Sequence, residues 1–449
     1  MPSLITGLLN SESDGTNWRF QNVRRSINYN YPNGSAVLVA LSALLKEEAV
    51  NDQKFIIFEK RFAEASTTTA AVTTGFITLT GTNTEVANLA DFAVDGLNRI
   101  KVTSTARFRA GNIVRIRNLA CGAAGATLVS VNASVESVVD STKLEVRWLE
   151  AVTDYYLNAA NVGIEVLVIG NSAYEGQTGA ALVPYQLPDE VYNYLQIMRT
   201  PFQLTGSANK TALRQDKNGP YPDKAKDAML AHATEQEKTW LFGTRGMYTD
   251  TTTGLPKKMT GGIEWYLKQW ELGTVYGNSA TAITADTDDQ KRIIENTAGT
   301  LTLKQWNSYL ERLFRVTSNE SNEKVFLCGN GFLMTLNDLY AGKSVFNYNS
   351  PIKAGRFGYD FVSQVTPWGT VYYKTHPLFN LNSYWRYGAF ALDTGNLKYM
   401  YLKGRDTQLL TEREPNNADY LEDEWLGECG LQLTLPESCM IFKNMQTAV

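Results

Sequence analysis

The side chains best suited to catalysis or metal binding are few and scattered in this 449-residue chain. Its two histidines, His232 and His376, lie far apart and have no cysteine or acidic partner at a metal-ligand spacing. The four cysteines form no CxxC pair and no dense framework, which favours a reducing or protected location over a disulfide-stapled secreted one. These patterns argue against zinc, haem and histidine-triad sites. We therefore predict a protein that is not an enzyme and that binds no cofactor or metal.

Two other patterns could suggest ligand binding. The turns Gly243–Gly246 and Gly329–Gly331 come nearest to phosphate loops, but neither completes a nucleotide-binding motif. A carboxylate run from Asp419 to Glu428 has no histidine and no spaced Asn or Asp that would complete a calcium loop. We predict simple turns for the glycines and a solvated or partner-facing surface for the carboxylates.

The composition indicates a folded protein and excludes some classes of function. With 42 basic and 46 acidic residues, the formal charge of −4 provides no basic field of the kind a dedicated nucleic-acid binder has. No apolar run approaches the roughly 20 residues of a membrane span, and the first residues have no features of a signal peptide. The 23 tyrosines are more informative, because tyrosine is enriched at protein–protein interfaces.

The first 50 residues are predicted to be an arm that is ordered by contact with something else. Isolated aromatic residues such as Trp18 follow no period, and an apolar, helix-like stretch occupies 36–48. Arg24 and Arg25 beside these aromatics are a weak signal for nucleic-acid binding. Pairing of these arginines with carboxylates of another subunit fits equally well, and better if the chain forms oligomers.

A compact all-β module, a barrel or a sandwich, is predicted over about 66–170. Short stretches with alternating apolar residues are separated by glycine turns, as where Leu144, Val146 and Trp148 point to one side of a strand. Its start is rich in threonine. The rest of the chain mixes helices with strands, so the predicted fold class is α+β.

The longest predicted helix spans about 222–242, with Gly243 as its stop. Met229, Ala233 and Trp240 form only a thin apolar stripe along this helix, and its other faces are polar. We therefore expect the helix to have partners on more than one side. A capping box at 302–305 opens another helix, and a buried strand over 325–328 leads through Gly331 into the next.

The middle of the chain resembles the major capsid, or head, proteins of tailed bacteriophages. The resemblance lies in an N-x-x-Q-I strand, a long helix with an acidic pair, a glycine at its end and a GGI turn. The matching residues are Asn193, Gln196, Ile197, Glu235, Glu237, Gly243, Gly261, Gly262 and Ile263. The resemblance covers residues 175–270 well and residues 300–445 loosely. One departure is that the bulky residues Tyr194 and Leu195 fill the middle positions of the first motif.

This resemblance implies an HK97-type capsid fold with an inserted all-β domain. Its parts would be an N-terminal arm, two flanks of an extended loop, the inserted domain, a long spine helix with the peripheral domain, an axial domain and a return to the peripheral domain. These map in that order to 1–53, 54–65 with 171–208, 66–170, 209–300, 301–384 and 385–449.

The resemblance further implies a subunit that self-assembles, as hexameric and pentameric capsomers, into the icosahedral head of a tailed phage. The head would enclose double-stranded DNA without reading its sequence, would form in the host cytoplasm without a membrane, and would contact portal, scaffolding or decoration proteins. The alternatives are an encapsulin-like nanocompartment shell and an adhesin or carbohydrate-binding protein built on the β module. The candidate assembly residues are Trp18, Arg24, Arg25, Lys60, Arg61, Asp419, Glu422 and Asp423.

Overall fold

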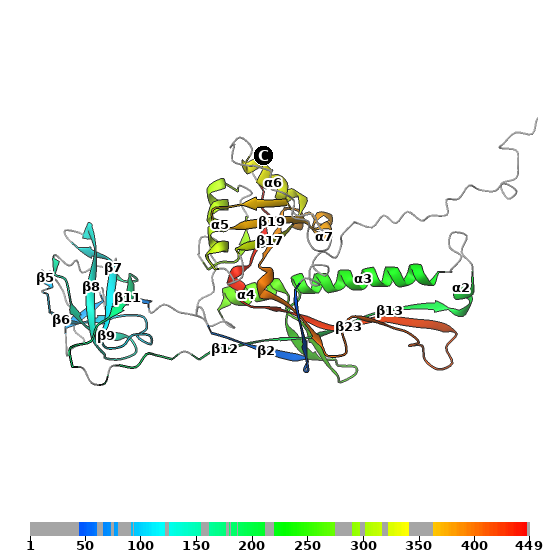
Figure 1. Cartoon of the computed structure of the whole chain (residues 1–449), viewed down its shortest axis with the longest axis horizontal. Helices are drawn as coiled ribbons and strands as arrows, with labels where there is room; N and C mark the ends of the chain where they lie inside the picture. The colour runs from blue at the N-terminus through cyan, green and yellow to red at the C-terminus, as the bar shows by residue number, and fades with distance from the viewer. Residues whose placement is uncertain are drawn as a thin grey trace, which may run out of the picture. The chain divides into compact units, whose positions relative to one another are not determined.

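A computed structural model describes the chain from residue 45 to residue 446 with gaps. The gaps are 61–65, 73–75, 80–90, 93, 122–124, 154–160, 177–178, 180, 186, 212–219, 274–289, 297–300, 317–321 and 341–361. The chain divides into two compact units, coloured by residue number in Figure 1. The first unit comprises Met1–Glu59 and Asp189–Val449, and the second comprises Lys60–Pro188.

The second unit is organised around a seven-stranded sheet whose neighbouring strands are antiparallel. In spatial order the strands are β3 (Ser66–Thr68), β11 (Glu165–Asn171), β7 (Asn112–Cys121), β8 (Thr127–Val138), β9 (Lys143–Trp148), β6 (Leu97–Lys101) and β4 (Ile77–Leu79). A separate pair is formed by β5 (Asp91–Phe92) and β10 (Val152–Thr153).

The threonine-rich segment joins two parts of this sheet that are far apart in its strand order. Thr69 exchanges backbone hydrogen bonds with the start of β11, donating to Ile164 and accepting from Gly163 at 2.9 Å each. It also forms a bridge to Val102, just after β6. The segment therefore pairs on both sides, which removes free strand edges where it runs. Threonine suits this place because a β-branched residue favours the extended backbone.

The predicted alternation in β9 is confirmed by its burial. Leu144, Val146 and Trp148 are fully buried, and they pack with the apolar residues of the other strands in one core. The indole nitrogen of Trp148 donates to the side chain of Asn98 at 2.8 Å, so this large buried ring also has its polar group satisfied.

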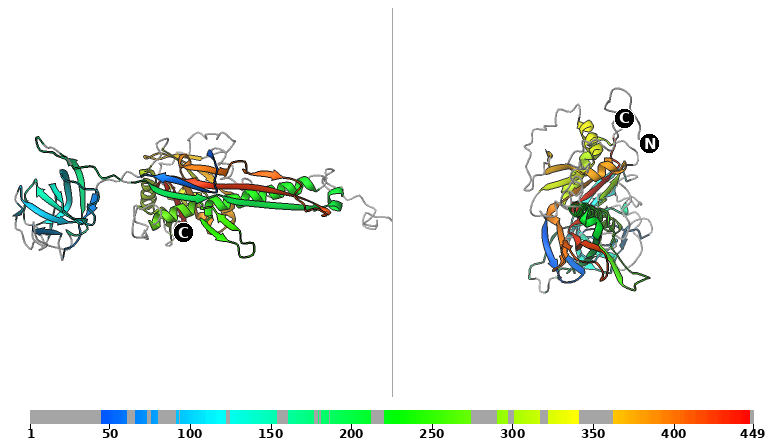
Figure 2. Two further views of the ribbon diagram at one scale, coloured as in Figure 1. Left: turned by 90° about the horizontal axis from the view of Figure 1, so that it is seen from below. Right: turned by 90° about the vertical axis from the view of Figure 1, so that its right-hand side faces the viewer.

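The first unit contains a long helix, α3 (Tyr221–Phe242), which runs alongside the strands β13 and β23 (Figures 1 and 2). These strands belong to a five-stranded sheet ordered β1-β21-β23-β13, with β22 also paired to β23. Their bounds are β1 (Lys46–Val50), β21 (Leu397–Leu402), β23 (Tyr420–Leu433), β13 (Gln196–Thr205) and β22 (Gln408–Leu410). The helix predicted over 222–242 is confirmed. Residues 46–48, in contrast, belong to the strand β1, so the helix predicted over 36–48 is wrong at these residues. Residues 36–44 of that stretch lie outside the described residues.

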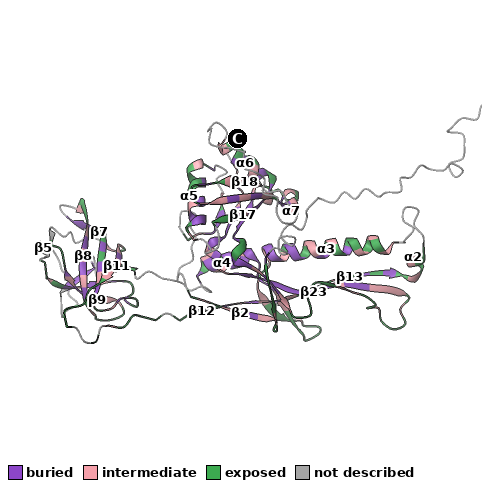
Figure 3. Ribbon diagram, in the orientation of Figure 1, coloured by how far each residue is buried: buried purple, intermediate pink, exposed green. Residues whose placement is uncertain are grey.

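The predicted apolar stripe of α3 is only partly correct. Met229 is exposed and Ala233 is half-buried, whereas Trp240 is buried. Exposed residues dominate the N-terminal half of α3, as Figure 3 shows by colour. Its buried face also includes the polar side chains of His232, Gln236 and Glu237. Buried polar groups need partners, so this helix is held by specific hydrogen bonds as well as by apolar packing.

A six-stranded mixed sheet in the same unit packs with two helices. Its order is β16 (Ile293–Glu295), β24 (Met440–Lys443), β20 (Ala389–Leu392), β17 (Glu323–Cys328), β19 (Thr370–Thr375) and β18 (Val362–Val365). The helices are α5 (Leu303–Arg315) and α6 (Asn330–Tyr340). The predicted capping box between Thr302 and Gln305 is present at the start of α5. Trp306 of α5 packs against Phe326, Phe332 and Phe442 in the core of this part.

The described residues of the first unit also form two two-stranded ribbons. One pairs β2 (Lys54–Glu59) with β12 (Asp189–Tyr194), and the other pairs β14 (Gly246–Thr249) with β15 (Pro256–Met259). The other helices among the described residues are α2 (Gly206–Lys210), α4 (Ile263–Leu272) and α7 (Pro377–Leu381), with the short helical turns η3 (Trp385–Tyr387), η4 (Thr394–Asn396) and η5 (Pro436–Ser438). Within the described residues, none of the helices has the length and hydropathy needed to cross a membrane.

Candidate assembly surface and the framework beneath it

Asn193 and Gln196, from the first sequence motif, hold the glycine turn of the second. The buried amide of Asn193 donates to the carbonyl oxygens of Gly261 and Leu431 at 3.0 and 2.9 Å. Its oxygen accepts from the Gly261 backbone N–H at 2.8 Å. The Gln196 side chain accepts from the backbone N–H of Thr260 at 3.2 Å. Residues about 65 positions apart in sequence therefore form one hydrogen-bonded junction between β12, β13 and the start of α4.

Gly243 and Gly262 are required by the close approach of other backbone atoms. A Cβ atom on Gly262 would lie 2.6 Å from the carbonyl oxygen of Trp240 and 2.9 Å from the backbone nitrogen of Gly243. A Cβ atom on Gly243 would lie 2.8 Å from the carbonyl oxygen of Thr260. Gly243 ends α3 with a negative φ of −56°, so space rather than a left-handed backbone explains its residue type.

The acidic pair of the long helix separates into two environments. Glu235 is exposed, while Glu237 is fully buried and contacts the ring nitrogen Nε2 of the equally buried His376. This pair links α3 to the segment that follows β19. His232 is buried on the same helix, and its Nδ1 lies 3.0 Å from the hydroxyl oxygen of Thr200 on β13. Burial lowers the pKa of His232, while the charge of Glu235 opposes that shift.

The C-terminal carboxylate run lies on and just before β23, and most of it is buried within the chain. Asp423 is 1% exposed, and its carboxylate accepts from the Tyr221 hydroxyl at 2.5 Å and from the Glu412 N–H at 3.0 Å. The hydrogen bond to Asp423 raises the pKa of Tyr221 to about 12. This contact fixes the first turn of α3 against the sheet.

Arginines neutralise the next two carboxylates. Glu424 is buried and pairs with Arg199 of β13 at 2.5 Å and with Arg413, from the segment that follows β22, at 3.1 Å. Glu428 is buried and pairs with Arg405 at 3.0 Å. The expectation of a solvated or partner-facing surface is therefore wrong for Asp423, Glu424 and Glu428. A strand that pairs on both edges and lies under a helix leaves such side chains little access to solvent.

Asp419 and Glu422 remain accessible candidates from the predicted set. Asp419 is exposed next to Gly206, and half-buried Glu422 accepts from Gln203 at 3.0 Å. Lys60 is exposed, and its ammonium nitrogen lies 4.1 Å from the centre of the Tyr185 ring. The other candidates, Trp18, Arg24, Arg25 and Arg61, lie outside the described residues, as do the acidic residues 286–289. The structure therefore leaves the predicted arm contact untested.

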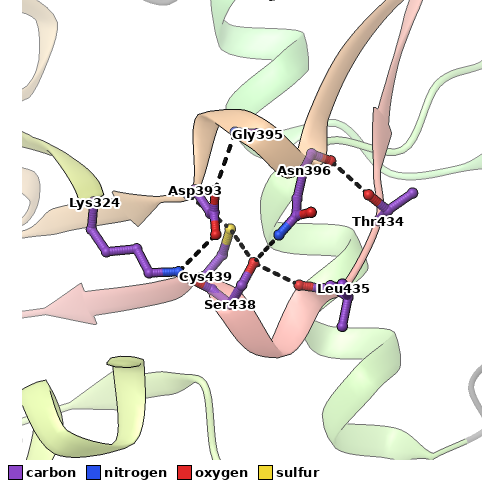
Figure 4. Close-up of polar contacts among 8 residues, drawn as sticks. All are labelled: Lys324, Asp393, Gly395, Asn396, Thr434, Leu435, Ser438 and Cys439. Carbon is purple, nitrogen blue, oxygen red and sulfur yellow. Dashed lines mark hydrogen bonds and ion pairs between the residues drawn. The ribbon is translucent and has the colours of Figure 1, made fainter. Parts of the chain in front are cut away.

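A buried ion pair that the sequence did not predict lies where the chain passes between the five-stranded and the six-stranded sheet of the first unit. The Lys324 ammonium of β17 donates to Asp393 at 2.8 Å and to the carbonyl oxygen of Ser438 at 3.0 Å (Figure 4). Both charged side chains are essentially inaccessible to solvent. Glu323 and Lys324 come directly before the apolar residues of β17, as surface charges at the start of a strand do, so the local sequence contained no signal for this pair.

Further hydrogen bonds join the two chain crossings near this ion pair. Asn396, which precedes β21, donates through its side-chain amide to the Ser438 hydroxyl at 2.9 Å. The Thr434 hydroxyl, which follows β23, donates to the carbonyl oxygen of Asn396 at 3.1 Å (Figure 4). The connection from β20 to β21 is thereby fastened to the connection from β23 to β24. This arrangement suits a rigid framework, because each buried polar group has a defined partner.

The four cysteines are shielded from solvent. All four cysteines are buried free thiols, and burial raises the pKa of Cys429 to about 12, which disfavours the reactive thiolate. In the part of the chain that the structure describes, no group of three or more His, Cys, Asp or Glu residues could hold a metal ion.

Comparison with known proteins gives a family for the chain. Residues 10–446 match the family described as SU10 major capsid protein. The chain is 23% identical over 468 residues to the major capsid protein of Pseudomonas phage PaMx41, with 99% of this chain and 97% of that protein covered.

Solved structures with partial likeness include three capsid or shell assemblies. The capsid of the native GTA particle gives a TM-score of 0.43 at 9% identity, covering 98% of this chain and all 100% of that one. A chain from Mycobacterium phage Bobi gives 0.41 at 9% identity, with 96% and 98% covered. The SrpI encapsulin of Synechococcus elongatus gives 0.37 at 11% identity, with 59% and 79% covered.

The family match spans nearly the whole chain, including the motif residues that meet around Asn193. The predicted fold class, α+β of the HK97 type, is confirmed, while the inserted all-β domain stays a prediction. The chain belongs to the SU10 major capsid protein family.

Proposed function

We propose that this phage major capsid protein self-assembles through hexameric and pentameric capsomers into the icosahedral head of a tailed bacteriophage. The observation that supports this most is the family match over residues 10–446. The head encloses double-stranded DNA without sequence-specific contacts, which suits a chain with a formal charge of −4. Assembly takes place in the host cytoplasm, and portal, scaffolding or decoration proteins are its further partners.

The role is structural and involves no catalysis. Buried thiols with a raised pKa and histidines used for packing are consistent with this assignment. The family match favours a phage head over an encapsulin-like nanocompartment shell.

We further propose the domain division implied by the resemblance. Residues 1–53 act as the arm, 54–65 and 171–208 as flanks of the extended loop, and 66–170 as an inserted β domain. The spine helix and peripheral domain occupy 209–300 and 385–449, and the axial domain occupies 301–384. The compact unit Lys60–Pro188 and the direct pairing of Glu59 with Asp189 support an insertion whose ends are adjacent.

The proposed arm contact uses Trp18, Arg24 and Arg25 against an adjacent subunit, where the accessible carboxylates are Asp419 and Glu422. Lys60 and Arg61 are proposed as further contact residues. Buried Asp423 helps to hold this surface in place through its hydrogen bond with Tyr221.

Electron microscopy of the chain expressed alone and with its neighbouring phage genes tests the function. Closed icosahedral particles are expected. A chain that stays monomeric in both preparations while its 66–170 segment binds glycans would instead favour the adhesin alternative.

The arm contact has its own test. Charge reversal of Arg24 and Arg25 should block assembly, and added charge reversal of Asp419 and Glu422 should restore it. Absence of any rescue would count against that contact.

A further inference from the structure

The turn between α3 and β14 carries an arginine, Arg245, in a short segment that is held at both ends. At one end the Gly262 N–H donates to the carbonyl oxygen of Gly243 at 2.8 Å. At the other end β14 begins at Gly246 and pairs with β15. The backbone that bears Arg245 is therefore fixed close to the start of α4.

The guanidinium of Arg245 contacts two aromatic rings and one carbonyl oxygen. Its Cζ atom lies 3.9 Å from the centre of the Tyr192 ring on β12 and 4.4 Å from the centre of the Trp265 ring on α4. Its Nη1 donates to the carbonyl oxygen of Tyr192 at 2.7 Å. A planar guanidinium can stack on rings and donate hydrogen bonds at the same time. Arg245 thus links the strand β12 to the first turn of α4.

The two rings are themselves supported by neighbours. Trp265 is 7% exposed, and a Cβ atom on Gly261 would lie 2.5 Å from its ring. Tyr192 meets a second cation, because the Lys54 ammonium of β2 lies 4.2 Å from the centre of its ring. Lys54 also pairs with Glu190 of β12 at 3.9 Å. These contacts join β2 to β12, so a group that holds β12 holds the whole ribbon.

The opposite face of the β2–β12 ribbon is held by the core. Phe55 and Asn193, which are paired across the two strands, are buried, and Val191 is fully buried. Side chains alternate along a strand, so Tyr192 points to the other face. A two-stranded ribbon has little stability in water by itself, so its direction depends on such contacts. Arg245 supports the face that the core does not cover.

We propose that Arg245 is a positioning residue for assembly, because it fixes the direction in which the β2–β12 ribbon leaves the five-stranded sheet. The subunit then enters assembly with its ribbon already in one orientation. Pre-organising a segment in this way reduces the conformational entropy that is lost on association. The inference rests on the proposed self-assembly and concerns the free subunit, before any contact with another copy.

The first test is hydrogen exchange of the dissociated subunit, read by mass spectrometry. Arg245→Met removes the guanidinium and keeps a long unbranched side chain. Exchange in peptides covering 54–59 and 189–194 should accelerate at least tenfold, while peptides from α5 and α6 should not change. Arg386→Met is the matched control, because Arg386 is exposed and its Cζ atom lies 5.8 Å from the centre of the Tyr387 ring, outside the ribbon. This control should leave exchange in the ribbon unchanged.

A second variant shows whether Arg245 acts through the Tyr192 ring. Tyr192→Leu keeps an apolar side chain and removes the ring on which the guanidinium stacks. It should accelerate exchange in the ribbon as Arg245→Met does, and the double variant should be no faster than either single variant. Effects that add in the double variant would overturn the inference. Wild-type exchange in the ribbon of Arg245→Met, or equal loosening of α5 and α6, would overturn it as well.

Assembly kinetics give a readout that local stability alone would not change. Light scattering should show that Arg245→Met subunits assemble at least tenfold more slowly than wild-type and Arg386→Met subunits. Arg245→Lys keeps the charge but lacks the planar guanidinium, so it should recover less than half of the wild-type rate. A wild-type rate for Arg245→Met or for Arg245→Lys would contradict the positioning role. A wild-type chain that forms no particles would instead contradict the proposed function, while the exchange experiment would still decide how Arg245 acts on the ribbon.

Discussion

Replacement of Asn193 by alanine should destabilise the first unit because it removes the amide that joins the two sequence motifs. The buried side chain bonds both the N–H and the C=O of Gly261, and it also donates to the carbonyl oxygen of Leu431. The Leu431 oxygen keeps a second donor, the Tyr266 hydroxyl at 3.2 Å. Truncation therefore leaves two buried backbone groups of Gly261 without this partner.

The expected loss of unfolding free energy follows from the penalty for leaving a buried polar group without a hydrogen bond. At about 1–3 kcal/mol for each such group, two groups give about 2–6 kcal/mol. Water that enters the vacated space offsets part of this loss. We expect the free energy of unfolding of the first unit to fall by about 3 kcal/mol in Asn193→Ala.

The assay is urea unfolding of the dissociated subunit, combined with hydrogen exchange read by mass spectrometry. Peptides covering 260–266 should lose protection, while peptides from β7 and β8 in the second unit should not change. Gln203→Ala is the control, because Gln203 is exposed and its amide bonds half-buried Glu422 at 3.0 Å, and this change should alter stability by no more than about 0.5 kcal/mol. If Asn193→Ala costs no more than this control, or loosens β7 and β8 equally, the reasoning is refuted.

Three further perturbations test other parts of the framework. Gly262→Ala should prevent soluble expression, because its new methyl group meets backbone atoms that cannot move away cheaply. Gly170→Ala should be tolerated, since a Cβ atom there meets nothing within 4 Å; equal yields of the two variants would contradict this. Lys324→Met should lower the free energy of unfolding by about 3–5 kcal/mol because it strands the buried Asp393 charge, and Asp393→Asn added to it should recover part of the loss in thermal unfolding. His232 has its pKa lowered by burial from an ordinary value of 6.5, so its contribution to stability is present above pH 6.5 and is lost as the pH falls through the lower folded-state pKa. His232→Gln should therefore flatten the dependence of unfolding free energy on pH below 6.5, and an unchanged slope would show that this histidine is not responsible.

Local sequence patterns were sufficient for the elements whose signals repeat along the chain. The alternation of Leu144, Val146 and Trp148 identified a strand with one buried face, and the capping box at Thr302 identified the start of α5. The long helix before Gly243 was predicted within one residue of its start. These signals are local, because backbone periodicity and end capping depend on residues only a few positions apart.

Burial of charge could not be predicted, because it depends on partners that are distant in sequence. Asp423 looked like part of a solvated acidic run, yet Tyr221 satisfies it from the start of α3. His376 looked isolated, yet it meets Glu237 from 139 positions away. A carboxylate in a charged run has the same local appearance whether it faces water or a donor.

The sequence by itself therefore determined the kinds of elements, the order of the motifs and the absence of metal-ligand or triad spacing among its histidines. Only the tertiary structure decided which charged side chains are internal supports and which remain on the surface. The physical reason is that removing a charge from water is costly unless a partner is brought to it, and only the folded chain brings Lys324 to Asp393 and Arg199 to Glu424.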